Sequence, residues 1–171
     1  MPKKKKKGFL SLLGIEAEKA PSTDEKAKAE RQAKVVLAWQ YLRDRIDRGV
    51  LEYLQSGDSQ IIRDHVAQPV QGKMIDHLDR LRANGLVLQQ PDRSTRTKPR
   101  FEVVSEQLNA KGMPTSFVIR ENFTDFSVLQ ATNGQESSAG GRDRAIQAKV
   151  EVEDGQHFRL LEIIEVKGAT I

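Results

Sequence analysis

The sequence predicts an α+β domain in which N-terminal helices pack in the concave face of a curved antiparallel sheet. Two observations carry this prediction. Apolar residues recur at helical spacing of three and four over residues 35–81, and the spacing changes to every second residue after Gly85. Helices gathered before a run of antiparallel strands are typical of two-layer α+β folds.

The charge distribution separates a tail from this domain. Residues 1–20 hold six lysines and two glutamates, which accounts for the whole net charge of +4, so residues 21–171 are neutral. We therefore divide the chain into a basic and apolar tail, residues 1–21, and a single α+β domain, residues 22–171. The tail is expected to be disordered or to contact a membrane, and the neutral domain lacks a general basic footprint for nucleic acid.

A long first helix is predicted over residues 23–55. Ser22 and Glu25 have the S-x-x-E spacing of a capping box, in which each side chain bonds the other residue's amide. The first turns are polar on all sides, and we expect them to contact a partner. An apolar stripe then faces the core. It consists of Val35, Trp39, Leu42, Ile46, Val50 and Tyr53.

Two shorter helices follow the first. One is predicted over residues 59–67, and a third is predicted from Pro69 to Ala83, with Asn84-Gly85 as its left-handed cap. Their core-facing residues are Ile61, Ile62, Val66, Val70, Met74, Leu78 and Leu81.

Five strands are predicted after Gly85. They cover residues 86–89, 101–109, 115–132, 144–153 and 157–166, with a glycine- and serine-rich loop over residues 133–143. In the long middle strand the apolar residues change parity around Thr124-Asp125. We interpret this change as a β-bulge, which bends a strand.

The order of these elements resembles the cone-shaped nuclear transport factor 2-like fold, a cystatin-like arrangement. More narrowly, "YLQSGDSQIIRDHVAQPVQGKMIDHLDRLRANG", residues 53–85, resembles the C-terminal domain of the mitochondrial import-motor anchor and its bacterial relatives. The resemblance implies scaffolding or binding at a membrane surface. Its broader fold also hosts small-molecule isomerases and dehydratases, so fold alone does not fix function.

The tail is the first candidate site. Lysines attract anionic lipid headgroups, and a short apolar segment beside them can insert into the bilayer. Contact with RNA or ribosomal phosphate and a tail without a binding role are the alternatives. The membrane- or phosphate-contacting residues are Lys3, Lys4, Lys5, Lys6, Lys7, Phe9, Leu10, Leu12 and Leu13.

A second basic cluster is predicted in a loop over residues 91–100. It consists of Arg93, Arg96, Lys98 and Arg100, in a stretch that has prolines at 91 and 99. Such a loop can hold phosphates, lipid headgroups or an acidic partner, and the alternative is a solvated loop.

A pocket inside the cone is the third candidate. Trp39, Tyr53, His77, Phe101 and Phe117 are expected to line it, or else to fill the core. His65 and His77 each follow an aspartate, but adjacent helical residues do not face each other. The sequence contains no cysteine and no phosphate-binding or nucleophile motif, so we expect no metal, cofactor or catalytic residue.

These observations favour a non-enzymatic binding or scaffolding protein. It would be cytoplasmic and peripheral at the inner face of a membrane, with anionic lipid and a protein as partners, and a homodimer is a further option. A ribosome- or RNA-associated protein using the tail and the residue 91–100 loop is the first alternative. A small-molecule-binding protein, or a lyase or isomerase with a pocket inside the cone, is the second.

Overall fold

The computed structural model describes residues 20–89, 96–131, 133–138 and 140–167, with residues 86–89 described by their backbone alone. Contacts divide the chain into two compact units, residues 1–31 and 32–171, which we describe separately. The elements in chain order are α1 (Thr23–Ser56), α2 (Gln60–His65), α3 (Val70–Ala83), β1 (Leu86–Gln89), β2 (Arg96–Leu108), β3 (Pro114–Asp125), β4 (Val128–Ala131), β5 (Glu136–Ser138), β6 (Arg142–Glu153) and β7 (His157–Glu165).

The start of α1 belongs to the first unit and carries the predicted capping box. The Ser22 N–H donates to Glu25 Oε2 at 2.7 Å, and the Glu25 N–H donates to Ser22 Oγ at 3.2 Å. These reciprocal bonds satisfy two amides that the first helical turn leaves free. The predicted capping box is confirmed.

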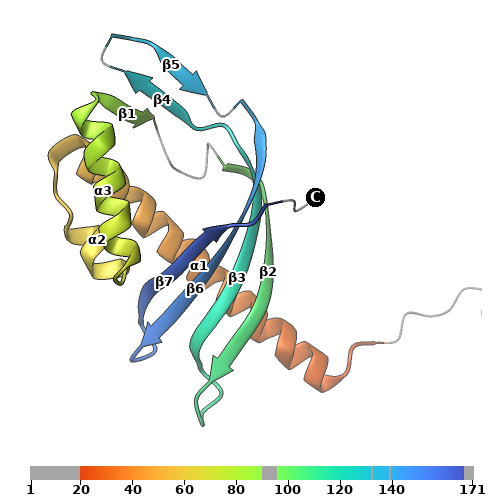
Figure 1. The fold of residues 1–171 in the computed structure, drawn as a ribbon. Helices are drawn as coiled ribbons and strands as arrows, with labels where there is room; N and C mark the ends of the chain where they lie inside the picture. Colours follow the sequence, from red (N-terminus) through yellow and green to blue (C-terminus); the bar gives the residue numbers. More distant parts are fainter. Residues whose placement is uncertain (1–19, 90–95, 132, 139, 168–171) are drawn as a thin grey trace, which may run out of the picture. The chain divides into compact units, whose positions relative to one another are not determined.

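The second unit places the rest of α1 against an antiparallel sheet of order β2-β3-β6-β7, which curves around the helix (Figure 1). The predicted α+β class is therefore confirmed. The predicted α1 stripe is buried except for the half-buried Val50, and Trp39 and Leu42 are completely inaccessible. Gly49 permits a close approach of α2, because a Cβ at this position would lie 3.0 Å from Ile61 Cγ2.

The helix ends agree with the predicted turn residues. Gly57 after α1 and Gly85 after α3 have φ angles of +80° and +63°, a region that glycine adopts without strain. The second helix is shorter than predicted, because Val66 is extended and forms a bridge with Leu160 on β7.

The predicted long strand over residues 115–132 is wrong in one respect. Instead of bulging at Asp125, the chain leaves the sheet: β3 ends there and β4 pairs with β1 and β5 in a separate three-stranded sheet. The Asp125 carboxylate accepts a hydrogen bond from the Ser127 N–H at 2.8 Å. The main-chain carbonyl of Asp125 accepts one from the Gly141 N–H at 2.9 Å. These bonds hold the turn in place. The residues predicted as the loop 133–143 include β5, which pairs with β4.

Candidate functional site

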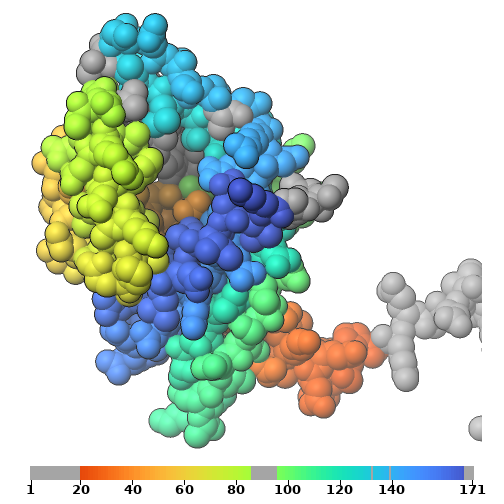
Figure 2. All heavy atoms as spheres, viewed as in Figure 1, coloured from red at the N-terminus to blue at the C-terminus, as the bar shows by residue number. Residues whose placement is uncertain are grey.

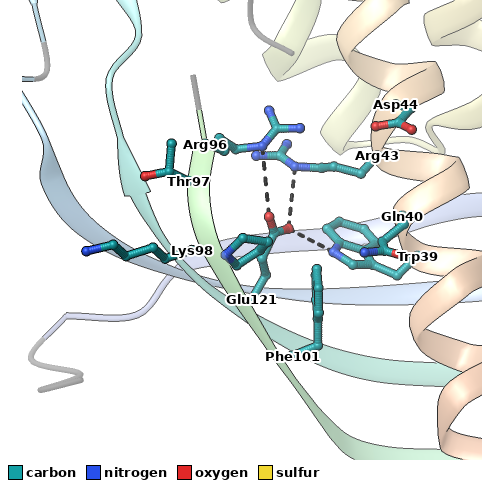
Figure 3. Close-up of a pocket in the computed structure, with 10 residues that line it drawn as sticks. Trp39, Gln40, Arg43, Asp44, Arg96, Thr97, Lys98, Phe101 and Glu121 are labelled. Atoms are coloured by element: carbon teal, nitrogen blue, oxygen red, sulfur yellow. Dashed lines mark hydrogen bonds and ion pairs between the residues drawn. The ribbon is translucent and has the colours of Figure 1, made fainter. Parts of the chain in front are cut away.

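A cluster of four charged side chains lies between α1 and the sheet. Arg43 and Asp47 stand one turn apart on α1, Arg96 begins β2, and Glu121 lies in the middle of β3. Figure 3 shows Arg43, Arg96 and Glu121 facing one another. Asp47 is 8% exposed and Glu121 is 4% exposed. Two cations and two anions therefore share a largely buried space. We call these four residues the interior ion cluster.

Glu121 is the centre of the interior ion cluster. Its Oε2 accepts a hydrogen bond from Trp39 Nε1 at 2.8 Å and lies 3.7 Å from Arg43 Nε. Its Oε1 lies 3.9 Å from Arg96 Nε. One carboxylate thus faces an indole donor and two guanidinium groups (Figure 3).

Asp47 completes the cluster on the helix side. Arg96 Nη2 donates to its Oδ2, and Arg43 Nη1 lies 4.0 Å from its Oδ1. Burial raises the pKa of Asp47, against the opposing effect of Arg43 and Arg96, and burial lowers the pKa of Arg43. Burial also lowers the pKa of Arg96, but the bond to Asp47 and the negative charges of Asp47, Glu121 and Asp44 together outweigh it, so the pKa rises overall. The pairing offsets only part of the cost of burying Asp47 and Arg43, since burial remains the larger effect on both.

A second, partly buried ion pair lies nearby on the sheet. Arg144 Nη1 donates to Asp125 Oδ2 at 2.9 Å, and Arg144 Nε donates to Glu165 Oε1 at 3.1 Å. Burial favours a higher pKa for Asp125, but the Ser127 and Arg144 hydrogen bonds outweigh it and lower the pKa. This carboxylate is therefore held ionised as a structural acceptor.

Two cavities flank the interior ion cluster, and Arg43 and Arg96 line both. The first, of about 300 Å³, has Trp39 and Phe101 on its walls and Lys98 beside them. The second, of about 380 Å³, lies between α1, α3 and the strand ends. It is lined by apolar residues, by Asp47 and Asp125, and by His77.

The residues predicted to share one pocket are distributed over several places. Trp39 and Phe101 line the first cavity, and His77 lines the second. Phe117 lines a third cavity of about 110 Å³ near Val35 and Phe158. Tyr53 donates a hydrogen bond to Asp79 Oδ1 at 2.5 Å.

The predicted basic loop over residues 91–100 is wrong for its second half, because β2 begins at Arg96. Arg96 is not a surface cation, since its side chain is 9% exposed and is paired with Asp47. Lys98 and Arg100 are exposed, and Arg93 lies outside the described residues. The four cations therefore do not form one surface cluster.

Sequence reasoning missed Arg43, Asp47 and Glu121, although a signal was present. Glu121 has the same parity as Phe117, Ile119 and Phe123, so it lies on the buried face of β3. A carboxylate on the apolar face of a strand requires a buried partner. The parity of Glu121 therefore predicts a cation opposite it, although not which one.

His65 and His157 come together although they are far apart in the sequence. Their rings stack at 5.4 Å between centroids, and each faces a carbonyl of the other element. His157 Nε2 lies 2.9 Å from Asp64 O, and His65 Nδ1 lies 3.4 Å from Phe158 O. In the part of the chain that the structure describes, no group of three or more His, Asp or Glu side chains is placed to hold a metal ion.

This pair predicts a loss of stability in weak acid. Burial lowers the pKa of His65 below its ordinary 6.5, and the positive charges of His157 and Arg45 lower it further. The hydrogen bond to the Phe158 carbonyl and the negative charge of Asp64 oppose this shift. The unfolded chain therefore binds the proton more readily, and stability falls as the pH drops below about 6.5. Urea midpoints measured from pH 8 to pH 5 should fall less steeply for His65→Gln than for the wild type. Equal slopes would contradict the role of His65.

The predicted tail residues, Lys3–Lys7 and Phe9, Leu10, Leu12 and Leu13, lie outside the described residues. Within residues 20–89, 96–131, 133–138 and 140–167, no helix has the length and apolar character needed to cross a membrane.

Comparison with known proteins finds a likeness among solved structures. No family model and no curated protein matches the chain. Among solved structures, it is similar to the intermembrane space region of the chloroplast protein ARC6, with a TM-score of 0.51 and 14% sequence identity, over 80% of this chain and 95% of that one. This likeness supports the α+β fold, and the narrower resemblance to the nuclear transport factor 2-like cone stays a prediction.

Proposed function

We propose that the chain is a non-enzymatic scaffolding protein that is held at a membrane surface by its lysine-rich, apolar N-terminus and docks a protein partner. The observation that carries the non-enzymatic part of this proposal is the pairing inside the interior ion cluster. Asp47 and Glu121 are each engaged by guanidinium groups, so neither is a free general base. A base must reach its substrate proton within hydrogen-bonding distance, and these carboxylates are occupied.

Two further features support a place beside a membrane. The fold neighbour is a region of a chloroplast protein from the intermembrane space, a compartment bounded by membranes. The tail of this chain joins five lysines to an apolar segment. Each lysine near an anionic surface contributes about 1 kcal/mol, and apolar insertion adds to it. We assign the protein to the cytoplasmic side, where anionic lipids attract basic segments.

Vesicle flotation tests the membrane part of the proposal. We expect the full chain to float with vesicles of phosphatidylcholine and phosphatidylglycerol, and a chain lacking residues 1–20 to remain at the bottom. Replacing Phe9, Leu10, Leu12 and Leu13 by serine should abolish flotation while leaving the five lysines in place. Equal flotation with and without residues 1–20 would contradict the proposal.

The same serine variant distinguishes membrane binding by the tail from RNA binding by the tail. Phosphate binding requires the lysines and not the apolar residues. If the full chain sediments with ribosomes at moderate salt, and the serine variant does so equally, the tail is a nucleic-acid contact.

A second candidate function, binding or isomerisation of a small molecule, is favoured by the second cavity. Its volume of about 380 Å³ suits a small ligand, and His77 stands at its wall with Asp125 and Arg144. A thermal-shift screen against small carboxylic acids and ketones would test it. A hit whose shift is lost in His77→Ala but kept in His157→Ala would favour this candidate over scaffolding alone.

A further inference from the structure

The outer edge of β7 is open over most of its length. β7 pairs with β6 on one side and ends the four-stranded sheet. The outer edge of β7 forms main-chain pairing at Leu160. Val66 forms a parallel bridge with Leu160, and the Ala67 N–H donates to Leu160 O at 2.8 Å. The chain then turns away into α3. It thus adds a single parallel residue to β7 and leaves residues 161–165 without a neighbouring strand in the described structure.

The ladder with β6 identifies which main-chain groups point outward. The Val166 N–H donates to Ala145 O at 2.8 Å, and Gln147 stands opposite Ile164 in the same register. Because bonded and non-bonded pairs alternate in an antiparallel ladder, Ile164 also faces β6. The N–H and C=O groups of Ile163 and Glu165 therefore point away from the sheet.

A groove runs beside this edge. Figure 2 shows a hollow between the yellow-green atoms of α3 and the dark blue atoms of β7. The groove has a volume of about 570 Å³, with Val70, Lys73 and Met74 on the helix wall and residues 161–164 on the strand wall. Its floor is apolar, because Val70, Met74 and Ile163 also pack against the core.

The opposite edge of the sheet is more strongly protected than the edge of β7. On β2, Pro99 removes one donor, Lys98 has a φ of +52°, and the ladder shifts register at three points. Prolines, charges and irregularities are the usual means by which proteins block an edge strand. Residues 161–165 contain no proline, and their ladder with β6 shifts register once, at Leu161, before running unbroken from Glu162 to Glu165. An open edge beside an apolar groove is the arrangement that extended peptides recognise.

We propose that an extended segment of a protein partner adds to the edge of β7, parallel to the strand, with alternate apolar side chains in the groove. This inference rests on the proposed docking function and names its surface. The parallel direction continues the pairing that Val66 begins. The two walls carry opposite charges, Lys73 on α3 and Glu162 on β7, so the segment carries a basic residue on the β7 side.

A second copy of this chain fits the edge less well. A dimer about a two-fold axis perpendicular to the sheet would pair two β7 strands antiparallel. This runs against the parallel direction that Val66 begins at Leu160. We therefore assign the groove to a different protein.

The test uses the full chain and a phage library of random nine-residue peptides. We expect selection to enrich peptides with alternating apolar residues, and a labelled synthetic peptide from the selection to bind in fluorescence anisotropy. Binding should weaken by roughly tenfold or more, about 1.4 kcal/mol, in Ile164→Lys. The reason is that Ile164 lines the groove, so the variant places a charge beside the bound segment. Val104→Lys is the matched control, because Val104 and Ile164 are both 46% exposed and Val104 lies on the other edge strand, β2.

Main-chain pairing is tested separately from the groove. Ile163→Pro removes an outward N–H and no bond to β6, a position where an edge strand tolerates proline. It should weaken the peptide, with folding checked by circular dichroism. In the wild-type protein, peptide addition should slow amide exchange at Ile163 and Glu165, whereas Ile164 should be protected with or without peptide.

Three outcomes would overturn the inference. These are no enriched peptide, a peptide that binds Ile164→Lys as tightly as Val104→Lys, and unchanged exchange at Ile163 and Glu165. Flotation of the same preparation distinguishes failure of the proposed membrane attachment from failure of the proposed β7 docking surface. A chain that floats with vesicles but fails these assays retains the membrane role and loses this docking surface.

Discussion

Glu121→Leu is expected to lower the free energy of unfolding by about 3–5 kcal/mol, because it removes one partner of a buried ion cluster. Arg43 and Arg96 would keep their charges in a space with one carboxylate instead of two, and Trp39 Nε1 would lose its acceptor. Urea denaturation followed by tryptophan fluorescence measures the effect, since Trp39 is the single tryptophan of the chain.

The matched control is Glu102→Leu on the neighbouring strand. Glu102 also forms an ion pair, with Arg120 at 3.2 Å, but its side chain is 62% exposed. Exposed pairs contribute about 0–1 kcal/mol, so the control should change stability little. Similar losses for the two variants would show that Glu121 is not part of a buried cluster.

Trp39→Ala is expected to lower the free energy of unfolding by about 3–5 kcal/mol, the usual range for truncating a large buried aromatic residue. Because this variant has no tryptophan, urea denaturation is followed by circular dichroism. The indole is completely inaccessible, and its removal opens a space between α1 and the sheet and leaves Glu121 without its N–H donor. Tyr41→Ala is the control on the same helix, because Tyr41 is 49% exposed. A loss for Trp39→Ala no larger than that for Tyr41→Ala would contradict the assigned core.

Trp39→Phe separates packing from hydrogen bonding at the same position. It keeps an aromatic ring but leaves a buried carboxylate oxygen without one donor, which costs about 1–3 kcal/mol. A value close to zero would mean that the two guanidinium groups alone satisfy Glu121.

Local patterns were sufficient to predict the helices and most strands. The α1 stripe from Val35 to Tyr53 depends on the helical repeat, and the Ser22–Glu25 box depends on a fixed spacing. Neither requires knowledge of distant contacts. The break at Asp125 depends on a bond from Gly141, which lies sixteen positions later, so the parity change alone did not distinguish a bulge from a change of sheet.

The candidate sites were harder to predict for the same reason. The pairing of Arg96 with Asp47 joins β2 to α1, and His157 meets His65 across more than ninety positions. Position in a basic run suggested an exposed Arg96, whereas tertiary packing buries it. The open edge of β7 has no sequence signal, because it depends on which strand ends the sheet and on where α3 leaves it.

Recruitment of a docked segment to a membrane is tested most directly by co-flotation. A labelled peptide selected on the β7 edge is mixed with the full chain and vesicles of phosphatidylcholine and phosphatidylglycerol, with a peptide-only sample as the blank. We predict that the peptide floats with the full chain, and stays at the bottom with the Ile164→Lys variant or with a chain lacking residues 1–20. A peptide that remains at the bottom with the full chain, or floats equally with all three, would contradict a scaffold that holds its partner at the membrane surface.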